Sequence, residues 1–471
     1  MNYRDNLLHE TWKNIDSDTF NILVREEKRQ KDKLILSAAL SIAPYSVREA
    51  NGSIFSNIDA EGHLPKWIEN ESLEQLFDLE RQIKLYNKFS DKRPNKNTEY
   101  ANVIEKIAQK RIANLFCTEK IDSSYIHVNV QPPTGAIANS IALEAVLNSG
   151  DTLLSMSLSD GGHLSHGSKI HQSSKKYNVI HYGIDPKTGK IDYENIKNIA
   201  SKIQPKLIIA GASSYPWEIE WDKLKKICEQ TQSKPYLMAD IAHTAGLVVG
   251  GMFPNPIEFA DIITMVTYKT FCGPRAAAIL TTDCELSKRI NRTTFPGMLG
   301  SPIFQNIVAL AISAKIAETE EFKILQRNIV QNAKLLSKLF KKNGISVAFE
   351  GTNSHIVIID LKKTKGLDKN INGEIAAKVL EECNIICNKN MLPGDKNAAE
   401  ASGIRLGTTW ISQLGIQEYT IHTIVENIVG ILNSIQVTTE KQSNLVGNLP
   451  INMYTNYKKS INHIINTIWS N

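Results

Sequence analysis

The stretch YLMADIAHTAGLVVGGMFPNPIEFADIITMVTYKTFCGPRAAAIL, residues Tyr236–Leu280, decides the fold of this chain. It contains two short apolar runs, Tyr236–Met238 and Ile262–Val266, and each run ends in polar residues. Short apolar runs that are closed by turn residues are typical of buried parallel strands. The stretch therefore predicts an α/β fold built on a parallel sheet.

Three side chains with useful chemistry follow these two runs. The first run leads to Asp240 and then to His243, and the second leads to Lys269. Ligands of open parallel sheets bind at the carboxyl ends of the strands, so we expect the three groups at one edge. A lysine that forms a Schiff base and a carboxylate that keeps a pyridine nitrogen protonated are what pyridoxal 5'-phosphate requires. From spacing alone a chance arrangement is the better explanation, because one Asp, one His and one Lys occur near apolar runs in most α/β proteins, but both interpretations stay open.

The whole chain has the composition of an ordinary globular protein. Its 471 residues are enough for two or three domains, with 42% apolar and 22% charged residues. The net charge of +5 is spread along the chain without a basic block, so no nucleic-acid partner is expected. No apolar run reaches the length of a membrane span, and the first residues do not form a signal peptide. The six cysteines have neither metal-ligand nor disulfide spacing, which indicates reduced thiols in a cytoplasmic protein without a metal site.

Several short sequence motifs in the opening stretch resemble those of one enzyme family. DIAHTAGLV, FPNP and TYKTFCGPR occur in the same order as in serine hydroxymethyltransferases, which are fold-type I pyridoxal-phosphate enzymes. The similarity runs from about Leu34 to the C-terminus with one interruption. It implies a large domain with a mostly parallel seven-stranded sheet between helices, and a smaller C-terminal α+β domain.

The resemblance also divides the chain. We expect an N-terminal arm at residues 1–57, a large cofactor-binding domain at 58–306 and a small C-terminal domain at 307–471. Residues 67–87 look inserted into the large domain, and their apolar residues have helical spacing. Residues 7–33 predict one or two amphipathic helices, and in the family such an arm packs across a dimer partner.

The alternation of apolar runs and helical segments between residues 125 and 280 predicts a βαβ layer. In the C-terminal part, one long helix is expected at Ala309–Lys342. Besides the two runs above, strands are expected at residues 128–132, 153–158, 207–210, 347–349, 355–361 and 404–408.

Small residues after the run at 128–132 point to an anion site. Thr134-Gly135-Ala136 leaves backbone N–H groups open at the start of a helix, and the resemblance makes it the cradle of the cofactor phosphate. The resemblance further implies that His163 stacks on the cofactor ring and that Ser213 contacts its phenolic oxygen or phosphate. Gly300 lies in a loop, 294–302, that reaches a neighbouring subunit's phosphate in the family. The expected cofactor-binding residues are Thr134, Gly135, Ala136, His163, Ser213, Asp240, His243, Lys269 and Gly300.

The substrate side of the site is also implied by the resemblance. Arg405 falls on the arginine that binds the substrate carboxylate, a task that suits the two parallel hydrogen bonds of a guanidinium. Ser37 matches a substrate-binding serine, and Asn390 belongs to a loop beside the folate. Glu61 matches the carboxylate that moves a proton at the substrate hydroxyl. The expected catalytic residues are Lys269, Glu61, His163 and Asp240.

The chain departs from the family where the substrate is handled. Ala38-Ala39 replaces a Glu-Asn pair, and Tyr268 replaces the histidine before the lysine. A pair of tyrosines is missing as well. Depending on the register, the places of the two tyrosines hold Pro94 and Asn95, or Ile68 and Glu69.

Three functions fit these observations. The first is serine hydroxymethyltransferase-like aldol and retro-aldol chemistry, in which serine or threonine gives glycine plus an aldehyde or a one-carbon unit for tetrahydrofolate. The second is a specialised threonine transaldolase or aldolase that does not use folate. The third is a non-catalytic protein that keeps the fold, and the presence of Lys269, Asp240, His163 and Arg405 argues against it. The resemblance implies a homodimer or a dimer of dimers.

Overall fold

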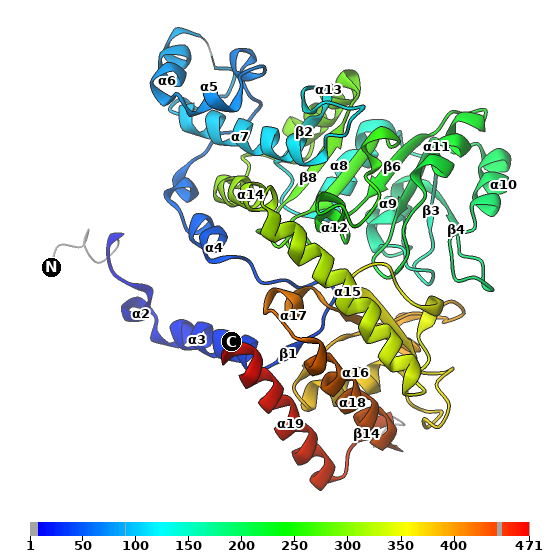
Figure 1. The fold of residues 1–471 in the computed structure, drawn as a ribbon. Helices are drawn as coiled ribbons and strands as arrows, with labels where there is room; N and C mark the ends of the chain where they lie inside the picture. Colours follow the sequence, from blue (N-terminus) through cyan, green and yellow to red (C-terminus); the bar gives the residue numbers. More distant parts are fainter. Residues whose placement is uncertain (1–7, 90, 440–444, 471) are drawn as a thin grey trace.

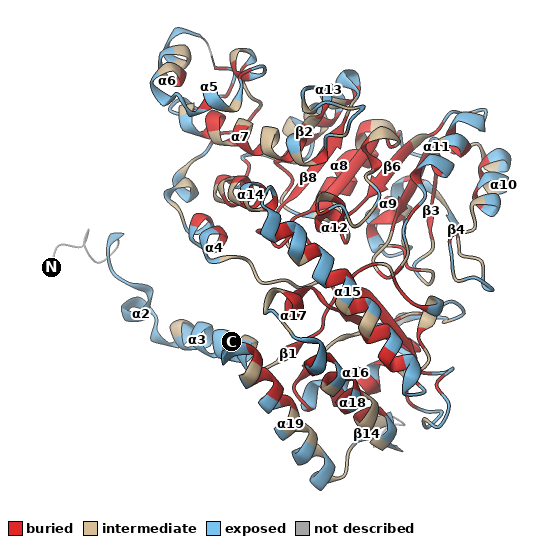
Figure 2. Cartoon of the chain, in the orientation of Figure 1, coloured by how far each residue is buried: buried red, intermediate tan, exposed pale blue. Residues whose placement is uncertain are grey.

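The computed structural model describes residues 8–89, 91–439 and 445–470, and it has two lobes with the N-terminal segment alongside the second (Figure 1). That segment forms two helices, α2 (Trp12–Ile15) and α3 (Ser17–Lys31), as the sequence predicts for the described part of residues 7–33. Residue 7 itself lies outside the described residues. Neither helix has a buried residue, so both appear in the colour of exposed residues over most of their length (Figure 2).

A seven-stranded sheet forms the centre of the first lobe. Its strands are β2 (His127–Asn129), β3 (Thr152–Met156), β4 (Asn178–Tyr182), β5 (Leu207–Gly211), β6 (Tyr236–Asp240), β7 (Ile262–Val266) and β8 (Ala277–Thr281). They lie in the order β2-β8-β7-β6-β5-β3-β4. Only β8 runs antiparallel to its two neighbours, and the other pairs are parallel. The predicted mostly parallel sheet is therefore confirmed.

Successive side chains of the central strands enter two different cores. Ile263 and Met265 of β7 pack in one core, and Ile262 and Val266 pack in the other. Side chains alternate between the faces of a strand, so a strand covered on both faces is apolar over most of its length. The first core is closed by α7 (Glu99–Phe116), α10 (Tyr193–Ile203), α11 (Trp221–Gln230), α12 (Ala245–Val249) and α14 (Phe304–Ala317). The second is closed by α8 (Gly135–Val146) and α13 (Cys284–Arg292).

The segment that looks inserted is helical, as its spacing predicts. It comprises a short turn at Lys66–Ile68 and the helices α5 (Leu73–Phe77) and α6 (Leu79–Lys88). Ser72 accepts a hydrogen bond from the Gln75 N–H, and the Gln75 side chain accepts one from the Ser72 N–H. This capping box starts α5, which then packs against α7 (Figure 1).

The prediction of one helix over Ala309–Lys342 is wrong. The chain forms α14 and then α15 (Glu320–Lys342), with a break at Thr319. Thr319 has extended backbone angles, and its Oγ1 accepts a hydrogen bond from the Phe322 N–H at 3.3 Å. The apolar spacing continues across the break, so periodicity alone did not reveal this cap.

The second lobe is an α+β layer. Its three-stranded antiparallel sheet has the order β11 (Asn388–Asn390), β12 (Gly403–Gly407), β9 (Ile356–Asp360). Two smaller pairs join β1 (Leu34–Ile35) to β10 (Ile385–Ile386), and β13 (Gln436–Thr439) to β14 (Leu445–Asn448). The helices are α16 (Gly373–Glu382), α17 (Thr409–Gln413), α18 (Glu418–Ser434) and α19 (Ile451–Ser470). The strand expected at 347–349 is absent, because Ala348–Glu350 forms a tight turn in which Phe349 has a φ of 58°.

The N-terminal chain contributes to this lobe before it crosses to the first. Leu34 and Leu36 are buried in the core of the second lobe, and α4 (Tyr45–Asn51) then packs against α14. The proposed boundaries at 57 and 306 remain predictions. Within the described residues, no helix combines the length and the apolar character that crossing a membrane would require.

Candidate active site

A cavity of about 130 Å³ opens beyond the carboxyl ends of β5, β6 and β7. It is lined by every residue expected to bind the cofactor except Gly300, namely Thr134, Gly135, Ala136, His163, Ser213, Asp240, His243 and Lys269. Asn139 and Tyr268 also line it. The position agrees with the rule that parallel sheets bind ligands at this edge.

Lys269 is held in a tight connection between β7 and β8. The hydroxyl of the next residue, Thr270, donates to the His243 carbonyl at 2.8 Å and accepts from the Gly246 N–H at 3.1 Å. These bonds tie the lysine turn to the end of β6. Burial lowers the pKa of Lys269 to about 8, and the nearby carboxylate of Asp240 only partly opposes this. A neutral amine is therefore accessible near neutral pH.

Asp240 ends β6 as a buried carboxylate with three polar contacts. Its Oδ2 accepts from Asn139 Nδ2 at 2.8 Å and lies 2.7 Å from His166 Nε2. Its Oδ1 accepts from the Ala242 N–H at 2.9 Å. Burial raises the pKa of Asp240, but the bonds from His166 and Asn139 and the nearby imidazoles outweigh it, so the pKa lies below its ordinary value. The group is a fixed negative charge in the cavity wall.

His163 is oriented by the same bonded group. Its Nδ1 accepts from the Ser165 N–H at 3.2 Å and lies 2.8 Å from Ser165 Oγ. Ser165 Oγ in turn accepts from Asn139 Nδ2 at 2.8 Å. Because Nδ1 is an acceptor, Nε2 carries the ring proton. Burial lowers the pKa of His163 to about 4, so the ring is neutral at physiological pH.

Asn139 and His166 were missed in the sequence. Thr264 Oγ1 donates to Asn139 Oδ1 at 2.7 Å, which orients the amide so that its NH₂ group faces Ser165 and Asp240. A weak signal for Asn139 was its place one turn into the helix that follows the Thr134 turn. The signal for His166 was a second histidine in the same glycine-rich loop as His163.

The Thr134 turn has the close packing that a phosphate cradle needs. Thr134 caps α8, and its Oγ1 accepts from the Ile137 N–H at 3.4 Å. A Cβ on Gly135 would lie 2.6 Å from Val266 Cγ1, so only glycine lets the helix start this close to β7. The first N–H groups of a helix have no acceptor inside it, and here they border the cavity.

Arg405 reaches from β12 toward the rim of this cavity. Its Nη1 donates to the Ser213 carbonyl, and its Nη2 lies 3.4 Å from Asn388 Oδ1. Ser37 Oγ donates to the same Asn388 oxygen at 2.9 Å, so Asn388 brings the two expected substrate residues together. Arg405 Nε is buried and has no hydrogen-bond partner among the described residues. Burial lowers the pKa of Arg405 to about 10, which still leaves it charged.

His243 pairs with a histidine from the second lobe. Its Nδ1 lies 3.3 Å from His355 Nε2, and the two rings stack with centroids 5.5 Å apart. Burial lowers the pKa of His243 well below its ordinary range and that of His355 to about 3. Both rings are therefore neutral, and they form a contact between the lobes beside the cavity. No signal in the sequence pointed to His355.

Five expected residues do not line the cavity: Ser37 and Arg405, described above, and also Glu61, Gly300 and Asn390. Glu61 and Gly300 lie together elsewhere, since Glu61 Oε1 is 3.1 Å from the place that a Cβ on Gly300 would take. Asn390 is buried on β11, and its Nδ2 donates to the neighbouring Met391 carbonyl at 2.6 Å. Cys272, close to Lys269 in the sequence, is buried, and burial raises its pKa to about 12. Its thiol stays protonated.

The cavity fits pyridoxal phosphate by its own chemistry. It offers a buried lysine with a lowered pKa, an ionised carboxylate, a neutral imidazole and a helix start that a Cβ would crowd. Among the described residues, no three His, Cys, Asp or Glu side chains are grouped so that they could hold a metal ion.

The comparison with known families agrees with this site. A family model described as serine hydroxymethyltransferase matches residues 66–428. The matched part includes the whole seven-stranded sheet and the residues Asp240, Lys269 and Arg405. Its members are pyridoxal-phosphate-dependent transferases. This chain belongs to the serine hydroxymethyltransferase family.

Proposed function

We propose that the protein catalyses aldol and retro-aldol reactions of a β-hydroxy amino acid, releasing glycine and an aldehyde or one-carbon unit from serine or threonine. The observation that carries this proposal is the shared cavity of Lys269, Asp240 and His163, with Arg405 at its rim. When bound, pyridoxal phosphate supplies an electron sink for the charge that develops at the Cα of the amino acid. The residues of the chain then decide which bond breaks.

Arg405 selects that bond by holding the substrate carboxylate. A guanidinium makes two parallel bonds to one carboxylate, and the unpartnered Nε of Arg405 is available for one of them. With the carboxylate fixed, the Cα–Cβ bond is aligned for cleavage, and such alignment accounts for much of the rate in oriented reactions. His163 lines the same cavity, and we propose that its ring covers the bound cofactor and keeps water out.

Glu61 is proposed to handle the proton. In the cleavage direction the Cα–Cβ bond breaks, the β-hydroxyl proton passes to Glu61 and the aldehyde leaves. The Cα then takes up a proton to give glycine. General acid–base help of this kind is worth roughly 10²–10⁴-fold. Because Glu61 and Gly300 lie outside the cavity of their own chain, we propose that they serve the cavity of a second copy.

A folate-independent aldolase or transaldolase is the second candidate, and one observation favours it. Ala38, in place of the glutamate of the family, is buried with Ile356, Ile358 and Leu392. The polar Glu-Asn pair is thus replaced by an apolar contact. The missing tyrosine pair adds to this, because losing a stacked aromatic face costs about 0.5–1.5 kcal/mol. That would weaken folate binding by up to about tenfold.

The test is to incubate the cofactor-loaded protein with serine and with threonine, each with and without tetrahydrofolate, and to measure glycine. We expect glycine without tetrahydrofolate and a higher turnover when an aldehyde is supplied. Lys269→Ala is the inactive control, and Asn390→Ala should matter only where folate is used. Strictly folate-dependent cleavage of serine that no aldehyde accelerates would establish the plain hydroxymethyltransferase and refute the folate-independent alternative.

A further inference from the structure

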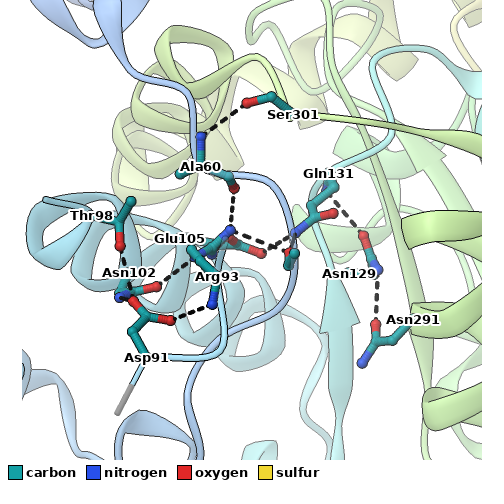
Figure 3. Close-up of polar contacts among 11 residues, drawn as sticks. Ala60, Asp91, Arg93, Thr98, Asn102, Glu105, Asn129, Gln131, Asn291 and Ser301 are labelled. Carbon is teal, nitrogen blue, oxygen red and sulfur yellow. Dashed lines mark hydrogen bonds and ion pairs between the residues drawn. The ribbon is translucent and has the colours of Figure 1, made fainter. Parts of the chain in front are cut away.

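Arg93 is completely buried, and all of its side-chain nitrogens make hydrogen bonds (Figure 3). Its Nη2 bonds Glu105 at 2.6 Å, and its Nε donates to Asn102 Oδ1 at 2.8 Å. Such complete bonding of a buried guanidinium calls for a reason.

The remaining nitrogen, Arg93 Nη1, indicates a function, because it bonds the backbone on both sides of Glu61. Arg93 Nη1 donates to the carbonyl of Ala60 and, at 3.2 Å, to the carbonyl of Gly62. Gly62 has a φ of 107°, a conformation that favours glycine. The backbone of Glu61 is thus held between two carbonyls that share one donor.

The same bonds connect Glu61 to the phosphate cradle. Gln131 Nε2 donates to the Gly62 carbonyl at 3.0 Å and to Glu105 at 2.9 Å. Gln131 lies just before the Thr134 turn that borders the cavity. Glu105 therefore bridges Arg93 and Gln131 (Figure 3), and the bond from Gln131 to Gly62 connects the Glu61 segment to the chain that leads into the Thr134 turn.

A further bond connects the Glu61 segment to the 294–302 loop. The Ala60 N–H donates to Ser301 Oγ at 3.1 Å, next to the Gly300 that Glu61 approaches. Three segments that the proposed site requires are thus linked through the residues beside Glu61, of which Ala60 and Gly62 are bonded directly to Arg93. Hydrophobic residues would stabilise a core of this size at least as well, because a buried ion pair loses much of its Coulomb energy to desolvation.

We propose that Arg93 is a positioning residue that holds the Glu61 carboxylate where the proton of the substrate hydroxyl is transferred. It touches neither substrate nor cofactor, and it acts only through the Ala60 and Gly62 carbonyls. The inference rests on the proton role proposed for Glu61.

The kinetic test compares Arg93→Lys, Glu61→Gln and the double variant. Lysine keeps the charge beside Glu105 but lacks the fork that reaches both carbonyls. We expect Arg93→Lys to lower kcat by about 100-fold, as small displacements of reacting groups do, with KM little changed. In the Glu61→Gln background the same substitution should have no further effect. If Arg93→Lys lowers kcat by the same factor in the wild-type and in the Glu61→Gln background, the proposal is wrong.

Arg81→Lys is the matched control. Arg81, on the partly exposed helix α6, also bonds a glutamate, Glu71, but among the described residues it makes no hydrogen bond to the Glu61 segment. We expect unchanged kcat. A loss in Arg81→Lys as large as that in Arg93→Lys would show that any change in this region lowers activity, and the proposal would fall.

Amide hydrogen exchange of the cofactor-free protein gives a measure that does not depend on activity. Arg93→Lys should speed exchange in residues 59–63 by at least about tenfold, while residues 236–270 stay unchanged. If amide exchange at residues 59–63 is unchanged, the positioning role of Arg93 is refuted, while the proton role of Glu61 is not affected. A fully active Glu61→Gln instead overturns the proton role of Glu61, and this inference with it, whatever the exchange shows.

Gln131→Met covers the case in which Arg93→Lys does not fold. It removes the second donor to the Gly62 carbonyl and keeps the volume. We expect Gln131→Met to lower kcat by about tenfold, and to cause no further loss of kcat in the Glu61→Gln background. A full effect in that background contradicts the proposal.

Discussion

His166 Nε2 lies 2.7 Å from Oδ2 of Asp240, and this contact joins the loop after β3 to the end of β6. Burial alone would raise the pKa of Asp240, and the bond from His166 is the largest contribution that opposes it. His166 therefore keeps the Asp240 carboxylate charged inside the cavity. A charged carboxylate there would pair with the protonated pyridine nitrogen of bound pyridoxal phosphate.

His166→Phe should weaken the binding of pyridoxal phosphate. Without the bond, burial raises the pKa of Asp240, and a hydrogen bond to a charged group is worth about 1.5–3 kcal/mol. We expect a dissociation constant about 10- to 100-fold higher, measured by fluorescence titration of the cofactor-free protein. His171→Phe is the control, since among the described residues the His171 side chain bonds only its neighbour Ser173. Equal dissociation constants for the two variants would contradict this role.

Amine labelling of the cofactor-free protein should reveal the low pKa of Lys269. Only the neutral amine reacts, so the labelling rate should rise with pH and level off above about 8. The exposed Lys288 is an internal control, because its bond to Glu285 raises its pKa and its rate should still rise at higher pH. Competitive acetylation read by mass spectrometry gives both curves.

Asp240→Asn sharpens this measurement. The carboxylate of Asp240 raises the pKa of Lys269, so its removal should move the midpoint of the curve below 8. A midpoint that stays in place or moves upward would show that the two groups do not interact.

Arg405→Lys should raise KM for the amino acid. The variant keeps the charge but loses the planar fork and the bonds to Ser213 and Asn388. We expect KM to rise about 10- to 100-fold for serine. Selection of serine over ethanolamine, which lacks the carboxylate, should fall by the same factor. Arg289→Lys, at a surface contact with Tyr236, should change neither value. Unaltered selection by Arg405→Lys would exclude a carboxylate partner.

The smallest active unit should be a homodimer, because Glu61 and Gly300 lie outside the cavity of their own chain. Mixing Lys269→Ala with Glu61→Gln should recover activity, since a mixed dimer contains one intact site. Each variant incubated alone under the same exchange conditions is the control. Sedimentation of an active monomer, or no recovery in a mixture shown to exchange subunits, would refute shared sites.

The sequence by itself determined the sheet and most of the cavity wall. The apolar runs at 236–238 and 262–266 became β6 and β7, because a strand covered on both faces is apolar at nearly every position. The turn at 134–136, His163, Asp240 and Lys269 line one cavity because each ends or follows a strand in the chain. These are local patterns, and local patterns are visible in a sequence.

Only the tertiary structure decided how those groups are held. The bonds from Asp240 to Asn139 and His166 span 101 and 74 residues, and those from Arg93 to Ala60 and Glu105 span 33 and 12. Periodicity reports which face of an element is buried, whereas these contacts depend on which elements become neighbours. The break at Thr319 was not predicted for a related reason. Thr319 caps a new helix through its bond to the Phe322 N–H, although the apolar periodicity continues past this point.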